Sequence, residues 1–265
     1  MPSSSIVHIY LSPHPDDAVF SCGGMIHRQV EAGGRVVVVT FCTGDPPAGP
    51  LSDFARGLHE RWNPQRRLPA AEMVAARRRE DLAAVDALGA QAVHLDLPDC
   101  IYRLNPATGL PLYASEAAIV GSVHPSELTL IRRTATKLST LLHGFGRHHL
   151  YVPLGIGQHV DHQLTRRAAE VAGGVYAYFE DYPYIAHESE QWAGPAAPGP
   201  HGRQLTPELI YLAEGDVCAR LDAMARYESQ LSSFWTSRQD LEVSVRQFTS
   251  RVGQQAPAER IWRVA

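Results

Sequence analysis

The first forty residues contain two short apolar runs on either side of a helix-like segment. Residues 6–11 (IVHIYL) are rich in β-formers, and residues 36–41 (VVVVTF) form a continuously apolar run. Residues 18–32 between them have helical character and end at Gly33-Gly34, a suitable helix C-terminus. A strand that is apolar throughout is typical of a parallel sheet with helices on both faces. The pattern therefore predicts a βαβ unit.

The same alternation of helix and strand continues along the chain. We expect helices at residues 70–88, 126–142, 161–172, 216–231 and 239–252, and strands at residues 92–97, 149–154, 175–180, 209–212 and 260–264. This alternation predicts an α/β fold, a Rossmann-like three-layer sandwich with a mostly parallel central sheet. At 265 residues the simplest division is one domain over residues 1–265.

Two segments interrupt the alternation. Residues 44–69 are long, irregular and rich in Pro, Gly and Arg, and we expect a loop that lies over the strand ends. Residues 187–202 (HESEQWAGPAAPGPHG) are expected to be disordered or to form a lid. Both segments are therefore candidates for shaping a pocket.

Charge and composition exclude several classes of function. The net charge of −4 provides no overall basic field to attract nucleic acid or anionic lipid. No run approaches the roughly 20 apolar residues that span a bilayer, and we expect no signal peptide. The four cysteines form no CxxC pair, which favours a reducing cytoplasm over a disulfide framework. We expect a cytoplasmic protein that binds no nucleic acid and has no membrane-spanning segment. An oligomer is possible.

The first predicted strand leads directly into a cluster of polar residues, Ser12-Pro13-His14-Pro15-Asp16-Asp17. Functional groups of a parallel sheet gather beyond the carboxyl ends of its strands, which is where this cluster should lie. A histidine and a carboxylate are suitable ligands for zinc. The alternative is a polar turn in which Asp16 or Asp17 only caps the following helix.

A second cluster lies at the end of the predicted strand 149–154. Two glycines are followed by Gln158-His159-Val160-Asp161-His162, so two histidines three residues apart share a face if a helix has begun. The alternative is a solvated loop that happens to contain histidines. Two clusters of acids and histidines at equivalent positions of the sheet favour a shared metal site over coincidence.

On these residues the chain resembles the LmbE/PIG-L superfamily of zinc-dependent N-deacetylases. The His-Pro-Asp-Asp motif at residues 14–17 and the His-x-x-His motif at residues 159–162 are similar to its signature. The resemblance also covers residues 77–80 (RRRE), 97–99 (LPD) and 227–230 (YESQ), and so spans nearly the whole chain. It implies a metal-dependent N-deacetylase, a hydrolase that acts on a linear amide.

The resemblance also implies a role for each site residue. The zinc ligands are His14, Asp17 and His162, and water completes an open site. Asp16 is the general base, and His159 is the general acid or the partner of the oxyanion. Substrate contacts are expected from Arg77 and Asp99. Arg78 and Arg79 follow Arg77 directly, and the alternative for this run of arginines is a solvated helix face.

The chemistry of these roles is consistent with general principles. Three protein ligands leave zinc a position for water, whose pKa then falls to about 7. An unligated Asp16 can accept a proton from that water, and a protonated His159 can stabilise the oxyanion. Either Asp16 or His159 can protonate the departing amine, and this choice stays open.

The resulting hypothesis is a zinc hydrolase that removes an N-acyl group, commonly N-acetyl, from a small amino sugar or glycoconjugate. The sugar follows only from the resemblance. One alternative is an amidase acting on a thiol conjugate or another small N-acyl compound, or an esterase. Another is a non-catalytic zinc-containing module that binds a glycan or a partner protein.

Overall fold

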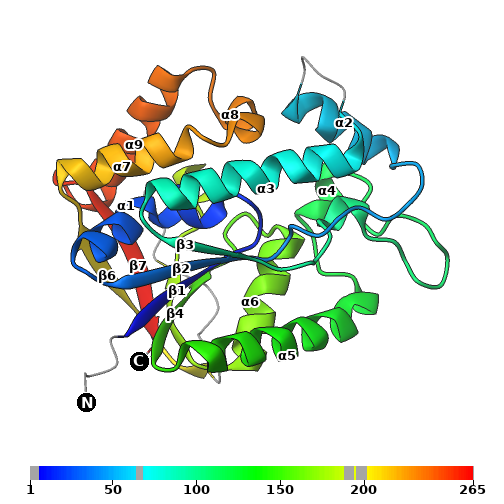
Figure 1. Ribbon diagram of the computed structural model, residues 1–265, viewed down its shortest axis with the longest axis horizontal. Coiled ribbons are helices and arrows are strands. Elements are labelled where there is room, and N and C mark those ends of the chain that lie inside the picture. Colours follow the sequence, from blue (N-terminus) through cyan, green and yellow to red (C-terminus); the bar gives the residue numbers. More distant parts are fainter. Residues whose placement is uncertain (1–5, 64–67, 188–193, 195–201, 265) are drawn as a thin grey trace.

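The computed structural model describes residues 6–63, 68–187, 194 and 202–264, and a seven-stranded sheet lies at its centre (Figure 1). The strand order is β3-β2-β1-β4-β5-β7-β6. The strands are β1 (Val7–Ser12), β2 (Arg35–Thr40), β3 (Gln91–His94), β4 (His148–Pro153), β5 (Val175–Phe179), β6 (Leu205–Tyr211) and β7 (Ala258–Val264).

The strands from β3 to β5 pair in parallel, whereas β7 is antiparallel to both β5 and β6. Helices cover both faces of this sheet, with α1, α3 and α7 on one side and α5 and α6 on the other in Figure 1. The described helices are α1 (Asp17–Glu31), α2 (Asp53–Trp62), α3 (Ala70–Ala87), α4 (Glu116–Ile119), α5 (Leu128–Phe145), α6 (Val160–Ala172), α7 (Glu214–Met224), α8 (Glu228–Phe234) and α9 (Arg238–Val252). The predicted three-layer α/β fold with a mostly parallel sheet is confirmed.

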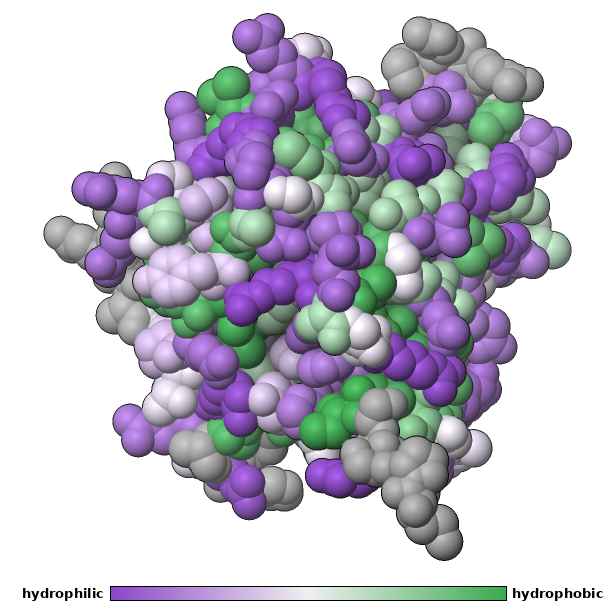
Figure 2. Space-filling view, turned by 60° about the vertical axis from the view of Figure 1, so that its left-hand side comes forward, coloured by the Kyte–Doolittle hydropathy of each residue, from purple (hydrophilic) through white to green (hydrophobic). Residues whose placement is uncertain are grey.

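The core lies between the sheet and its two helical layers. Strands β1 and β2 are buried almost along their whole length, which explains the mainly apolar residues at their centres. The face shown in Figure 2 is mostly hydrophilic, with apolar residues scattered over it in small groups. This is the usual surface of a domain that has its core inside. Among the described residues, no helix combines the length and apolar character needed to cross a membrane.

The order of the strands determines where a site can form. The chain runs from β1 to β2 and β3 on one side, and then returns to β4 and β5 on the other side of β1. The connections that leave β1 and β4 therefore diverge to opposite sides of the sheet, which opens a crevice beyond their carboxyl ends. The two polar clusters predicted from the sequence both lie at this switch point.

The structure corrects two of the predicted elements. The segment 44–69 is not one irregular loop, because it contains α2, whose first turn is capped by the Ser52 side chain. The predicted helix 216–231 is divided into α7 and α8. The break comes at Tyr227, which leaves helical geometry while its hydroxyl donates to the buried Asp81 at 2.7 Å. Of the predicted lid 187–202, all but residues 187, 194 and 202 lies outside the described residues.

Candidate functional site

A cavity of about 240 Å³ lies beyond the carboxyl ends of β1 and β4. Most of the residues named from the sequence line it, and the helices α2, α4 and α8 complete its walls. The polar lining residues at its inner end are His14, Asp16, Asp17, Arg77, Asp99, His159, Tyr184 and Gln230. His162 lies behind this lining and is almost fully buried.

The turn after β1 holds its carboxylates in unusual positions. Asp16 has a φ of 125°, a backbone conformation that a residue with a side chain rarely adopts and that costs on the order of 1–3 kcal/mol. Neither aspartate caps α1 with its side chain, because the hydroxyl of Ser12 accepts the Ala18 N–H instead. The predicted alternative of a simple capping turn therefore does not describe this segment.

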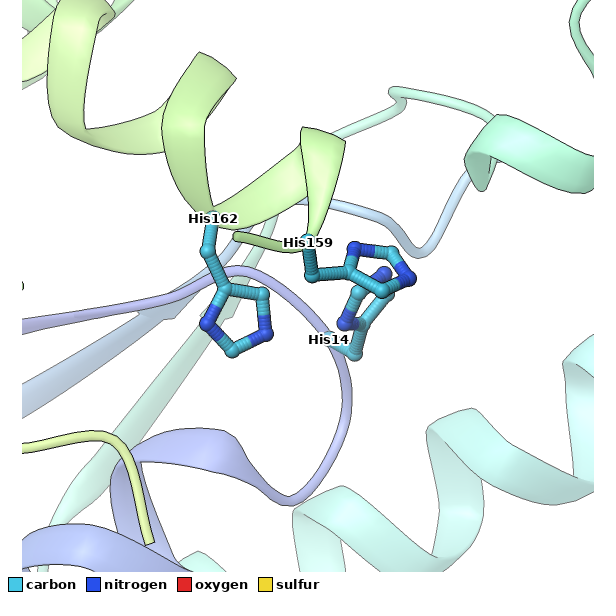
Figure 3. A group of neighbouring side chains, drawn as sticks. All are labelled: His14, His159 and His162. Carbon is cyan, nitrogen blue, oxygen red and sulfur yellow. The ribbon is translucent and has the colours of Figure 1, made fainter. Parts of the chain in front are cut away.

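The loop after β4 brings two histidines toward the first cluster. Figure 3 shows the rings of His14, His159 and His162 facing one another, the first from the turn after β1 and the others from the start of α6. Gly157 has a φ of 84°, and a Cβ at this position would lie 2.9 Å from the ring of Tyr184. A glycine is therefore needed for the loop to pass beneath this tyrosine.

Asp17 joins the two clusters. Its Oδ2 accepts the backbone N–H of His14 at 2.8 Å and lies 3.1 Å from the Nδ1 of the same residue. The same oxygen lies 3.3 Å from Nε2 of His162. Burial alone would raise the pKa of Asp17, but the imidazoles of His162 and His14 hold it well below the ordinary value. One carboxylate oxygen thus lies between two ring nitrogens.

His162 directs its Nε2 at Oδ2 of Asp17. Its Nδ1 lies 2.6 Å from Oδ1 of Asp181, and a carboxylate can only accept, so Nδ1 carries a proton. Its Nε2 is buried, and its 3.3 Å contact with Asp17 is not aligned as a hydrogen bond. Burial opposes protonation, yet Asp17 and Asp181 raise the pKa of His162 to about 10. The site therefore favours a positive charge at this nitrogen.

His14 is held in a similar way. Its Nε2 lies 3.1 Å from Oδ2 of Asp161, which also accepts the N–H of Cys100. Burial opposes its protonation, but Asp99, Asp161 and Asp17 raise the pKa of His14 well above the ordinary value. With Nε2 bound to Asp161, Nδ1 is the nitrogen that faces Asp17.

His159 differs from the other two histidines. Its Nδ1 accepts the backbone N–H of Asp161 at 3.2 Å and so caps α6, which places the ring proton on Nε2. Burial and the neighbouring His14 lower the pKa of His159 to about 3. The geometry thus favours a neutral imidazole that donates from Nε2, instead of the protonated His159 expected from the sequence.

The distances between the donor atoms are close to those expected around a metal ion. Ligand atoms about 2.0 Å from a tetrahedral zinc lie about 3.3 Å apart, close to both separations at Asp17 Oδ2. The rings of His14, His159 and His162 also offer nitrogens within 4.8 Å of one another. However, a neutral His159 that accepts a hydrogen bond at Nδ1 has no lone pair left at Nε2. His14, Asp17 and His162 form another candidate donor set, in which Oδ2 of Asp17 lies 3.1 and 3.3 Å from one nitrogen of each histidine.

Two further groups of donors meet the same distance limit, one with Cys42 and one with Cys100. Both include Asp161, whose other oxygen accepts from Arg103 at 2.5 Å. Burial raises the pKa of each thiol well above the ordinary value, which disfavours the thiolate that a metal needs. These groups are weaker candidates than the set around Asp17.

Arg77 is the arginine that enters the site. Its Nη1 lies 3.5 Å from Oδ2 of Asp99 and its Nη2 lies 3.7 Å from Oδ2 of Asp16, while its guanidinium lies 4.5 Å from the ring centre of Trp62. The next arginine, Arg78, instead donates to the carbonyl oxygen of Thr43. The structure thus settles which arginine of the run lies in the site.

Asp16 is buried beside another acid. Burial, followed by the charge of Asp17, raises its pKa well above the ordinary value, and Arg77 opposes this shift. The carboxylate lines the cavity and does not cap the start of α1 with a side-chain hydrogen bond. Such a group can exchange a proton with a bound molecule.

Three groups at the site were given no contact with the histidines or with Arg77 from the sequence. Asp161 and Asp181 each hold one histidine ring, and Trp62 packs against Arg77. Asp181 lies in the segment 179–184 (FEDYPY), which the sequence marks as a possible pocket lining or as ordinary strand-end packing, because it follows β5 at the same edge of the sheet. The role of Trp62 had no such signal, because the segment around it was expected to be a loop.

Several known deacetylases are similar to this chain. Residues 9–172 match the family model described as PIG-L, GlcNAc-PI de-N-acetylase. The chain is 29% identical over 196 residues to the 2'-N-acetylparomamine deacetylase of Niallia circulans, with 69% of each chain covered. Its structure is similar to the zinc inhibited form of teicoplanin deacetylase Orf2, with a TM-score of 0.85, 27% identity and 98% of each chain covered. It is also similar to the A40926 pseudoaglycone deacetylase Dbv21, with a TM-score of 0.79, 26% identity and coverages of 99% and 98%.

Proposed function

This chain belongs to the PIG-L family of GlcNAc-PI de-N-acetylases, and on that premise we propose that it is a zinc-dependent hydrolase that removes an N-acetyl group from an amino sugar or glycoconjugate. That it is an N-deacetylase follows from the family and from its named relatives. The zinc, the individual site residues and the kind of substrate are our proposals.

The position of Asp17 is the main support for the proposal. His14, Asp17 and His162 would hold the metal, because one ring nitrogen of each histidine lies near Oδ2 of Asp17, at 3.1 and 3.3 Å. When bound, zinc supplies Lewis-acid chemistry, which makes water more acidic and polarises a carbonyl oxygen. Nε2 of His162 is buried and is not aligned for a hydrogen bond with the neighbouring Asp17 oxygen, so a metal between the two atoms would satisfy both.

Asp16 acts as the general base. Its burial disfavours the charged form, so the carboxylate readily accepts a proton from the attacking water. Arg77 opposes the rise in the pKa of Asp16 and so favours the ionised form that a base needs, and it can also contact the substrate together with Asp99. These two contacts support Asp16 as a base that faces the cavity.

His159 stabilises the oxyanion as a neutral donor. Its Nε2–H can form a hydrogen bond with the oxygen of the reacting amide, a contribution typically worth about 3–4 kcal/mol. A neutral imidazole N–H is a poor acid, so we assign protonation of the departing amine to Asp16, which has just received a proton. This assignment resolves the choice that the sequence left open between Asp16 and His159.

The substrate is proposed from the relatives and from the cavity. The Niallia circulans relative is named for N-acetylparomamine, and the Orf2 and Dbv21 enzymes are named for teicoplanin and the A40926 pseudoaglycone. These names support an amino sugar or glycoconjugate. A polar inner end with apolar walls from Ile101, Ile119 and Phe234 also suits a sugar, which has hydroxyl edges and an apolar ring face.

A substrate panel tests the proposal. The zinc-loaded protein is incubated with N-acetylated amino sugars, N-acyl thiol conjugates and acetate esters, and release of the free amine and of acetate is measured. We expect amine release from the amino sugars. Release from the thiol conjugates or esters alone would support the amidase or esterase alternative. Bound zinc without turnover of any compound would support the non-catalytic module.

Two further assignments are retained as proposals. One is a single domain over residues 1–265, and the other is a cytoplasmic location. Limited proteolysis and fractionation of the source cells test them.

A further inference from the structure

We propose that Asp181 is a positioning residue that keeps the His162 proton on Nδ1 and so leaves Nε2 as the metal ligand. This inference rests on the proposed function, because it assumes that His162 binds the metal. Asp181 follows β5, whereas His162 lies on α6 after β4, so the contact joins two neighbouring strand ends.

Asp181 is held by three hydrogen bonds that leave it little freedom. Its Oδ2 accepts the backbone N–H groups of Gly155 at 2.7 Å and Ile156 at 2.9 Å. Its Oδ1 lies 2.6 Å from Nδ1 of His162. Two successive backbone N–H groups form a concave binding site for a carboxylate oxygen. An ionised carboxylate only accepts, so the shared proton belongs to the histidine.

The two oxygens of Asp181 have different partners. Oδ2 accepts both backbone N–H groups of the loop after β4, so Oδ1 is the oxygen directed at His162. Because the metal ligand and its orienting carboxylate come from different segments, a correct fold is required to set the tautomer.

The neighbouring acid, Glu180, provides a matched control. It is as deeply buried as Asp181, with 4% of its surface exposed against 1%. Its Oε1 accepts from Arg260 at 2.5 Å and from Trp262 at 2.9 Å, on the side toward β7. Replacing Glu180 therefore removes a buried carboxylate without touching His162.

Asp181→Asn tests the tautomer directly. The amide oxygen must face the N–H groups of Gly155 and Ile156, because its NH₂ group would oppose two donors there. The NH₂ group then points at His162 and donates to Nδ1. This favours the tautomer that carries its proton on Nε2, and a protonated Nε2 cannot bind a metal. A comparable exchange of Asp for Asn in serine proteases also produces the wrong histidine tautomer.

The experiment measures zinc affinity by competition with a chelating dye for the wild type, Asp181→Asn, Glu180→Gln and His162→Ala. We expect Asp181→Asn to weaken zinc binding about 10–100-fold, the range known for orienting partners of metal ligands. Glu180→Gln should stay within about twofold of the wild type. Equal affinities of Asp181→Asn and Glu180→Gln would overturn the inference.

A second measurement does not depend on the folding of a variant. In the zinc-loaded wild type, ¹⁵N-edited NMR of the histidine rings should show His162 protonated on Nδ1 with a strongly downfield, slowly exchanging proton. A proton on Nε2 would contradict the role of Asp181. If the wild type binds no zinc, or if His162→Ala binds it as tightly, the proposed metal site itself fails and this inference with it. The two failures are therefore distinguishable.

Discussion

Arg77 and Asp16 face each other in the buried site, with Nη2 of the arginine 3.7 Å from Oδ2 of the aspartate. The arginine comes from α3 and the aspartate from the turn before α1. Both side chains are buried, and Arg77 makes the largest contribution among the charges that oppose the raised pKa of Asp16. The pair links the proposed base to the helix that carries the arginine run.

Replacing Asp16 with Asn should remove catalysis and leave the metal site intact. A general base contributes about 10²–10⁴-fold to a rate, so kcat should fall by at least that range. Zinc affinity should stay within a few-fold of the wild type, because Asp16 is not a proposed ligand. Asp17→Asn is the matched control and should lose zinc. A fully active Asp16→Asn protein would show that the base is wrongly assigned.

Replacing Arg77 with Met should shift the pH profile in a defined direction. Arg77 lowers the pKa of Asp16, so its removal raises that pKa further, and the base stays protonated to a higher pH. The acidic limb of kcat/KM should therefore move to higher pH. Loss of a buried cation should also destabilise the fold by about 3 kcal/mol or more, measured by urea unfolding.

Arg78→Met is the control for this prediction. The Arg78 guanidinium is bonded to the Thr43 carbonyl oxygen and to Asp45 and is partly exposed. Its loss should cost less than about 1 kcal/mol and leave the acidic limb in place. An acidic limb that moves equally in both variants would contradict the assigned contact between Arg77 and Asp16.

The pH dependence should also reveal the protonation state of His159. Its pKa is lowered to about 3, so it is neutral throughout the range from pH 5 to 9 and loses no proton there. His159→Asn keeps a residue that caps helices well but shortens the donor. We expect about a 10²-fold loss of kcat with an unchanged shape of the alkaline limb. An alkaline limb that is present in the wild type and absent from His159→Asn would instead indicate an imidazolium.

Gly157→Ala should disturb the site more than Gly155→Ala. Both glycines have a positive φ, of 84° and 80°, so both substitutions carry a similar backbone cost of about 1–2 kcal/mol. Only at Gly157 would the new Cβ meet a ring, that of Tyr184 at 2.9 Å. This overlap should add about 1–3 kcal/mol and displace the start of α6. Equal unfolding free energies for the two variants would argue against the contact.

The layers of the fold were predictable because the sheet is buried on both faces. Strands such as β1 and β2 must then be apolar throughout, and that pattern is visible without coordinates. Two features depended on contacts between distant residues and were missed. The break at Tyr227 coincides with its hydrogen bond to Asp81, and α2 is a polar helix with only a narrow buried side.

The residues of the candidate site could be named from the sequence, but their protonation states could not. His14 and His162 could be named because each follows a strand that ends at the same edge of the sheet. The protonation of each ring could not be predicted, because it depends on the atom that each nitrogen meets. The capping bond at His159 and the carboxylate at His162 are such contacts. The neutral state of His159 is therefore a result of the structure.

The most direct test is a crystal structure of the zinc-loaded protein with anomalous diffraction recorded on both sides of the zinc edge. We predict one strong anomalous peak within about 2.0–2.2 Å of His14 Nδ1, Asp17 Oδ2 and His162 Nε2. A peak ligated by His159 in place of Asp17, or no peak between residues 17 and 162, would contradict the central claim.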